Sequence, residues 1–206
     1  MKKLLFLLFF IPLVSFGQIT LKEILSIDSE NTFIRTMIEN GFEEKTTPAN
    51  ADVMVTYVKE RLNQIISASF RRSDSISDAG VMIIFSPDAL EKNDVYDDIY
   101  NLVKRDCEFK EIREHLGKNI AMYSCPDPNP DPRLIELNIQ MKEKAKNNTS
   151  FNLTDLEIGF HKQNGLYVID MPINMLDDDE MVKLVTMLLE VDFDELKESL
   201  KDSIQK

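Results

Sequence analysis

Oxygen-bearing side chains at alternating positions are the first sign of chemistry in this sequence. In the segment CPDPNPDPRL, Asp127, Asn129 and Asp131 alternate with prolines. A calcium-binding loop needs such alternating ligands, followed by a glycine at position six and a glutamate at position twelve. Counted from Asp127, those two positions hold Pro132 and Asn138. We therefore expect no specific metal site in this segment, and weak calcium binding is kept as an alternative only.

The prolines of this segment favour a structural interpretation. Proline fixes the backbone near an extended conformation and cannot donate to a sheet ladder. We interpret residues 126–132 as a stiff joint that ends a strand at Cys125 and begins another near Leu134. The apolar residues from Ile135 to Met141 alternate with polar ones, which predicts that the next element is a strand.

Residues for nucleophilic catalysis are few. His115 and His161 are the two histidines, and the sequence has no Gly-x-Ser-x-Gly, His-Glu-x-x-His or glycine-rich phosphate motif. The acidic run from Leu176 to Glu180 is explained by capping of a helix start, where carboxylates stabilise exposed N–H groups. We assign no catalytic, cofactor or metal-binding residue. A pair of carboxylates could still be hidden among the 36 acidic residues.

The formal net charge of −12 limits the classes of partner. Such a charge repels nucleic acid and anionic membrane surfaces, so we expect no nucleic-acid binding. A solvated acidic surface that favours solubility is the preferred interpretation of this charge. Binding of cationic partners or divalent ions is the alternative.

The N-terminal residues have the layout of a secretory signal peptide. Lys2 and Lys3 precede an apolar run from Leu4 to Val14, and small residues follow at Ser15 and Gly17. The run is shorter than the ~20 residues of a membrane span, so we expect no stable membrane insertion after cleavage. Cleavage after Gly17 leaves residues 18–206, enough for one domain with its own core. The expected location is the periplasm or the outside of the cell.

The remaining pattern predicts an α+β fold, with antiparallel strands, flanking helices and two C-terminal helices. Helices are expected at about 29–40 and 94–106, each with apolar residues at helical spacing. Val81 to Phe85 is apolar throughout, which predicts a buried central strand. Met181 to Leu188 and Phe193 to Leu200 are the apolar stripes of the two C-terminal helices.

Residues 107–125, CEFKEIREHLGKNIAMYSC, predict a hairpin around Gly117. If Glu114 pairs with Lys118 across a three-residue turn, Ile112 lies opposite Ile120, Phe109 opposite Tyr123, and Cys107 opposite Cys125. Opposite residues of an antiparallel ladder lie close to the separation that a disulfide needs. In an exported chain these cysteines are expected to pair, closing a loop of about 19 residues worth on the order of 3 kcal/mol. Two buried thiols are the alternative.

The stretch from Tyr96 to Cys125, with Gly117 in the turn and a closing Tyr-Ser-Cys, resembles a group of uncharacterised small secreted bacterial proteins. The signal peptide and the helix near Phe33 are similar as well. This resemblance implies a location and an architecture and carries no activity. The chain after Asn147 departs from it.

Three functions follow from these patterns. The leading hypothesis is an exported, non-catalytic accessory protein that binds a protein partner. An envelope hydrolase with an unidentified carboxylate pair is the second, and a weak calcium-binding module is the third.

Overall fold

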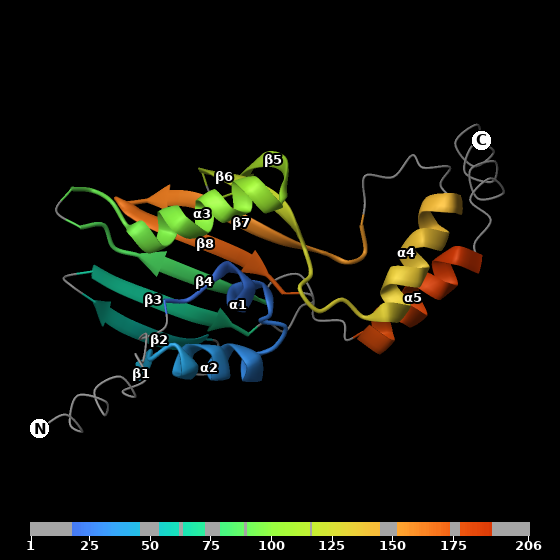
Figure 1. The fold of residues 1–206 in the computed structure, drawn as a ribbon, viewed down its shortest axis with the longest axis horizontal. Coiled ribbons are helices and arrows are strands. Elements are labelled where there is room, and N and C mark those ends of the chain that lie inside the picture. The colour runs from blue at the N-terminus through green and yellow to red at the C-terminus, as the bar shows by residue number, and fades with distance from the viewer. Residues whose placement is uncertain are drawn as a thin grey trace, which may run out of the picture.

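An eight-stranded sheet organises the protein, in which each pair of neighbouring strands is antiparallel (Figure 1). The structure is a computed structural model that describes residues 18–45, 54–61, 64–72, 79–88, 90–115, 117–144, 152–173 and 178–190. The expected α+β class is therefore confirmed. The signal-peptide segment and the last predicted helix lie outside the described residues.

The strand order is β1-β2-β3-β4-β8-β7-β6-β5. β4, the strand predicted to be central, lies between β3 and β8 with its backbone paired on both sides. The strands are β1 (Glu43–Lys45), β2 (Met54–Arg61), β3 (Gln64–Arg71), β4 (Gly80–Phe85), β5 (Glu108–His115), β6 (Lys118–Pro126), β7 (Asp155–Gln163) and β8 (Leu166–Pro172).

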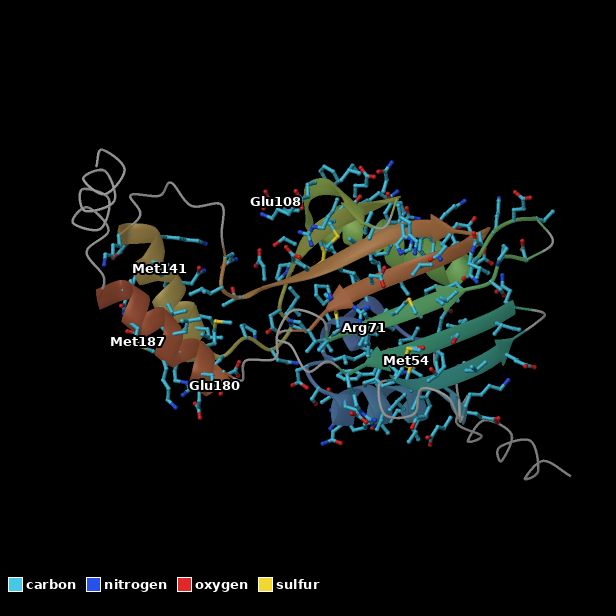
Figure 2. All side chains as sticks on the ribbon, turned by 180° about the vertical axis from the view of Figure 1, so that it is seen from behind. Met54, Arg71, Glu108, Met141, Glu180 and Met187 are labelled. Carbon is cyan, nitrogen blue, oxygen red and sulfur yellow. A yellow bond between two sulfur atoms is a disulfide. The ribbon has the colours of Figure 1, made fainter. Side chains whose placement is uncertain are left out.

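Three helices, α1 (Leu21–Leu25), α2 (Glu30–Glu39) and α3 (Asp94–Asp106), cover one face of the sheet (Figure 1). Each begins at a capping side chain: Thr20, Ser29 and Asn93 accept a hydrogen bond from a first-turn N–H group. Alternate strand residues point toward these helices and form the main core with them. Seen from behind, the opposite face carries no helix among the described residues (Figure 2).

The hairpin of β5 and β6 differs from the expected register at its tip. His115 pairs with Lys118, and Ile112 lies opposite Ala121 and not Ile120, so the three-residue turn was wrong. A bulge between Phe109 and Glu111 then shifts the register by one residue. Phe109 therefore faces Tyr123 as expected, because the shorter turn and the bulge compensate.

The predicted strand after the prolines is wrong, because residues Pro132–Lys144 form helix α4. Leu134, Leu137 and Met141 follow helical spacing, and they pack against α5 (Asp178–Glu190) in a second, smaller apolar cluster. The alternating residues Ile135 and Ile139 are exposed. An apolar set that alternates can also contain a helical stripe, and Pro132 occupies the first helical position, where proline is favoured.

Candidate functional site

Residues of the proline run line two different cavities. Pro126 and Pro128 line a cavity beside the two cysteines, whereas Asp127 and Asn129 line a larger cleft. An extended backbone turns successive side chains in different directions, and here the apolar and polar residues separate accordingly. Residues 126–132 thus connect the sheet to α4 while contributing to both cavities.

The polar side chains of this run have structural partners within the chain. The Asp127 carboxylate accepts a hydrogen bond of 2.7 Å from the backbone N–H group of Asn129. Asp131 accepts one of the same length from the Arg133 amide and binds the Arg133 guanidinium, which lowers the pKa of Asp131. The described parts of the chain hold no group of three or more acidic, histidine or cysteine side chains placed to bind a metal ion.

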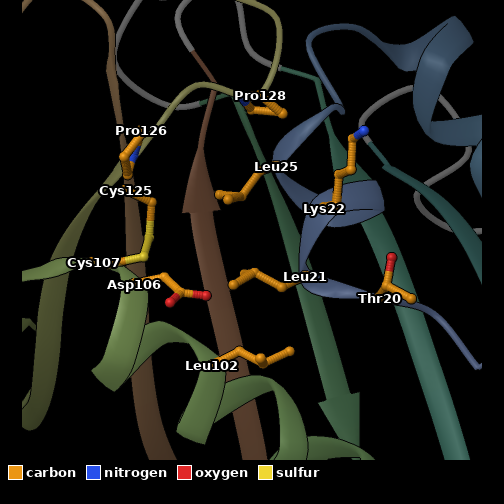
Figure 3. Close-up of a pocket in the computed structure, with 10 residues that line it drawn as sticks. All are labelled: Thr20, Leu21, Lys22, Leu25, Leu102, Asp106, Cys107, Cys125, Pro126 and Pro128. Atoms are coloured by element: carbon orange, nitrogen blue, oxygen red, sulfur yellow. A yellow bond between two sulfur atoms is a disulfide. The ribbon is translucent and has the colours of Figure 1, made fainter.

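The smaller cavity lies between α1, α3 and the cysteine pair (Figure 3). Its volume is about 370 Å³, and its lining includes Leu21, Leu25 and Leu102. The sulfur atoms of Cys107 and Cys125 are 2.10 Å apart, a disulfide distance, in agreement with the expected pairing. This bond joins the end of α3 to β6, and it removes both sulfurs from nucleophilic chemistry.

The larger cleft has a volume of about 600 Å³ and lies where the sheet meets the helical pair α4–α5. Its lining comes from the segment between α1 and α2, from the ends of β3 and β8, from the proline run and from both helices. The apolar part includes Phe70, Met171, Leu134 and Met181. Residues from both apolar clusters therefore meet in this cleft.

Carboxylates dominate the charged groups of the cleft. Among the described residues, one guanidinium, that of Arg72, lines it. Arg72 donates through Nε to Glu30 at 2.6 Å and through a second nitrogen to the other oxygen. This bidentate pair lowers the pKa of Glu30, so Glu30 is unsuited to act as a general acid. Against that guanidinium, the described lining contributes five carboxylates, those of Asp28, Glu30, Asp127, Asp155 and Asp178.

A polar network holds α4 to β7 at the back of the cleft. Buried Asn138 of α4 donates to the side chain of Asn152 and accepts from the Leu153 amide at 3.2 Å. Asn152 in turn donates to Asp155 at 2.6 Å, and Ser124 donates to the other Asp155 oxygen at 2.7 Å. Asp155 is thus occupied by structural hydrogen bonds. Sequence reasoning missed this network, although a polar residue inside the apolar stripe of α4 was a signal for it.

The two histidines lie on different strands. His115 is in β5, opposite Lys118, and His161 is in β7 on the sheet face without helices. His161 Nε2 is 2.7 Å from an oxygen of Asp170, while its buried Nδ1 has no hydrogen-bond partner. Neither histidine is among the described residues that line the two cavities.

Comparison with known protein families, with curated proteins and with solved structures finds no match to this chain. In the part that the structure describes, no helix has the length and apolar content needed to cross a membrane. The chain is thus an α+β protein with two cavities, one beside the cysteine pair and one where the sheet meets α4 and α5.

Proposed function

We propose that this protein is an exported accessory protein that binds a protein partner without catalysis, and that the larger cleft is the binding site. One observation carries the proposal: the cleft of about 600 Å³ combines apolar and acidic lining from segments far apart in the sequence. Protein interfaces combine an apolar centre, which is removed from water, with polar groups around it. Glu30 is paired with Arg72, Asp155 accepts two hydrogen bonds, and Asp28 and Asp127 accept one each from within the chain.

The surface of the helical pair supports the same proposal. Ile135 and Ile139 of α4 are exposed, as are Leu184 and Met187 of α5. Clustered apolar side chains on a surface are typical of protein contacts. A partner bound in the cleft would lie beside these helices.

Export is the second part of the proposal. The two cysteines lie at disulfide distance, and disulfides persist in oxidising compartments such as the periplasm. The signal-peptide pattern of residues 1–17 supports the same location.

Site-specific photo-cross-linking tests this function. A photoreactive p-benzoylphenylalanine replaces Met181, which lines the cleft, in the full chain expressed in its own cells. The matched control places the same residue at Ile65, an exposed position at the opposite end of β3 from Phe70. We expect a discrete protein adduct from position 181 and none from position 65. No adduct at position 181, or the same adducts from both positions, contradicts the proposal.

A carboxylate-pair hydrolase is the second candidate, because the cleft does bring carboxylates together. The lowered pKa of Glu30 and the double hydrogen bonding of Asp155 oppose it, since a general acid needs a raised pKa. Release of soluble fragments from isolated cell envelopes, abolished by Asp28→Asn or Asp127→Asn, would favour the hydrolase over the binding protein.

A further inference from the structure

The larger cleft is lined by apolar side chains, here called its floor, and by carboxylates, here called its rim, and these two kinds of lining together restrict what can bind there. Its accessible apolar surface comes from partly buried Leu153, Leu156 and Met181, because Phe70, Met171 and Leu134 are almost fully buried beneath it. A ligand on this floor gains free energy by removing apolar surface from water, at roughly 25 cal/mol per Å². A purely ionic ligand would leave that surface uncovered.

The charge of the rim selects a cationic ligand. The guanidinium of Arg72 is already engaged by Glu30, so this pair adds little net charge. Two further carboxylates stand on different segments: Asp28 immediately before the start of α2, and Asp127 within the proline run. Because the whole chain is strongly acidic as well, electrostatic steering favours a positively charged partner.

Asp28 and Asp127 are oriented before any ligand binds. Asp28 Oδ1 accepts a hydrogen bond of 2.7 Å from the Thr32 hydroxyl. Asp127 Oδ1 accepts one of 2.7 Å from the backbone N–H group of Asn129. An ionised carboxylate can accept about four hydrogen bonds, so each retains capacity for a cationic donor. Prolines on both sides of Asp127 restrict its backbone, which lowers the entropy lost on binding.

We infer that the cleft binds a short basic and apolar peptide segment of the partner, with lysine or arginine side chains at Asp28 and Asp127 and apolar side chains on the floor. This inference rests on the proposed function and specifies the chemistry of its partner. A segment with alternating basic and apolar residues, in an extended conformation, presents the two kinds of side chain to opposite directions. In such a segment the basic side chains can reach the carboxylates of the rim while the apolar side chains contact the floor.

Binding of a synthetic peptide tests the inference. The probe is a fluorescein-labelled Lys-Leu-Lys-Leu-Lys-Leu-Lys peptide, titrated with the protein at low salt and followed by anisotropy. The matched peptide carries glutamine in place of each lysine. We expect the lysine peptide to bind and the glutamine peptide to bind at least ~10-fold more weakly, since each partly exposed ion pair contributes up to about 1 kcal/mol.

Two double variants locate the site. D28N/D127N removes two charges but leaves side-chain oxygens that can accept the same internal hydrogen bonds. E60Q/E114Q removes two charges at exposed positions of β2 and β5 that do not line the cleft. We expect D28N/D127N to weaken binding about 10-fold and E60Q/E114Q to weaken it less than about 2-fold, the residual effect of net charge.

Equal weakening by both double variants, tight binding of the glutamine peptide, or no binding of the lysine peptide would each overturn the inference. Displacement of the peptide by spermidine at a lower concentration than by unlabelled peptide would also overturn it, in favour of a small polyamine. A protein adduct from position 181 that persists in D28N/D127N would leave the proposed function standing while the basic chemistry fails. Loss of that adduct at an unchanged yield of folded protein supports both.

Discussion

His161 shows how a single buried side chain depends on one partner. Its side chain is 3% exposed, and its Nε2 lies 2.7 Å from Asp170, whose side chain is 37% exposed. A carboxylate can only accept, so the N–H group at Nε2 donates to Asp170, while Nδ1 has no partner. Asp170 therefore satisfies the N–H group that burial would otherwise leave without an acceptor.

Substitution of Asp170 measures this dependence. We expect Asp170→Ala to lower the free energy of unfolding by about 1–2 kcal/mol, because the buried Nε2–H group loses its acceptor. Asp170→Asn keeps an oxygen at the same place, so a clearly smaller loss is expected. Urea unfolding at neutral pH measures both. Equal losses for the two variants would show that the hydrogen bond is not what Asp170 contributes.

The ion pair of Glu30 and Arg72 gives a pH dependence at the rim of the cleft. Hydrogen bonding to Arg72 lowers the pKa of Glu30 from its ordinary value of 4.5. A carboxyl with a lowered folded pKa stabilises the protein above its unfolded pKa, and the contribution disappears as the pH falls through the folded pKa.

Glu30→Gln tests this contribution. At neutral pH we expect the variant to be less stable than the wild type by about 0.5 kcal/mol, a small value because both side chains are partly exposed to water. The difference should shrink as the pH falls below 4.5. Urea unfolding curves at several pH values measure it. A difference that is constant with pH would mean that packing, and not charge, explains the effect.

The pair of cysteines connects three elements at one point. Cys107 ends α3 immediately before β5, and Cys125 lies near the end of β6 with no exposed surface. Their sequence separation is 18 residues, and the hairpin of β5 and β6 lies within that loop. The bond therefore restricts the hairpin and the end of α3 together.

Removal of this bond should destabilise the protein. We expect Cys107→Ala/Cys125→Ala to lower the free energy of unfolding by on the order of 3 kcal/mol, because the unfolded chain gains the entropy of the open loop. Denaturant unfolding of the variant, and of the wild type with and without reductant, gives two independent values. If reductant leaves the stability of the wild type unchanged, the expected contribution of the bond is wrong.

At the scale of the molecule, the apolar residues divide into two clusters of unequal size. The main cluster lies between the sheet and α1, α2 and α3. Among the described residues, the cluster of α4 and α5 has three buried members, Leu134, Leu137 and Val185. Stability within one chain varies with the apolar contacts of each part. The helical pair should therefore open at a lower free energy than the sheet.

Leu137→Ala tests this division. Leu137 is 9% exposed, and we expect its truncation to accelerate amide hydrogen exchange throughout α4 and α5 while β4 stays protected. Ile139→Ala on the same helix is the control, because Ile139 is 54% exposed and should change exchange little. Exchange that accelerates equally in β4 would show that the two clusters unfold as one unit.

The sequence by itself determined the features that depend on neighbours along the chain. The helices expected at 29–40 and 94–106 are α2 and α3, which begin at the capping side chains of Ser29 and Asn93, whereas α1 was not expected. The cysteine pairing also followed from local register, since a hairpin aligns residues by their distance from its turn. The register at the tip of the hairpin did not follow from the sequence. A two-residue turn with a bulge and a three-residue turn without one give the same alignment at the base of the hairpin.

Tertiary structure decided the rest. The segment from Ile135 to Met141 fits both a strand and a helix, and packing against α5, which is distant in sequence, selects the helix. The cleft likewise joins segments far apart along the chain, such as Asp28 and Asp127, so no local pattern could reveal it. Periodicity and capping act within a few residues, whereas burial and cavities depend on which segments meet after folding.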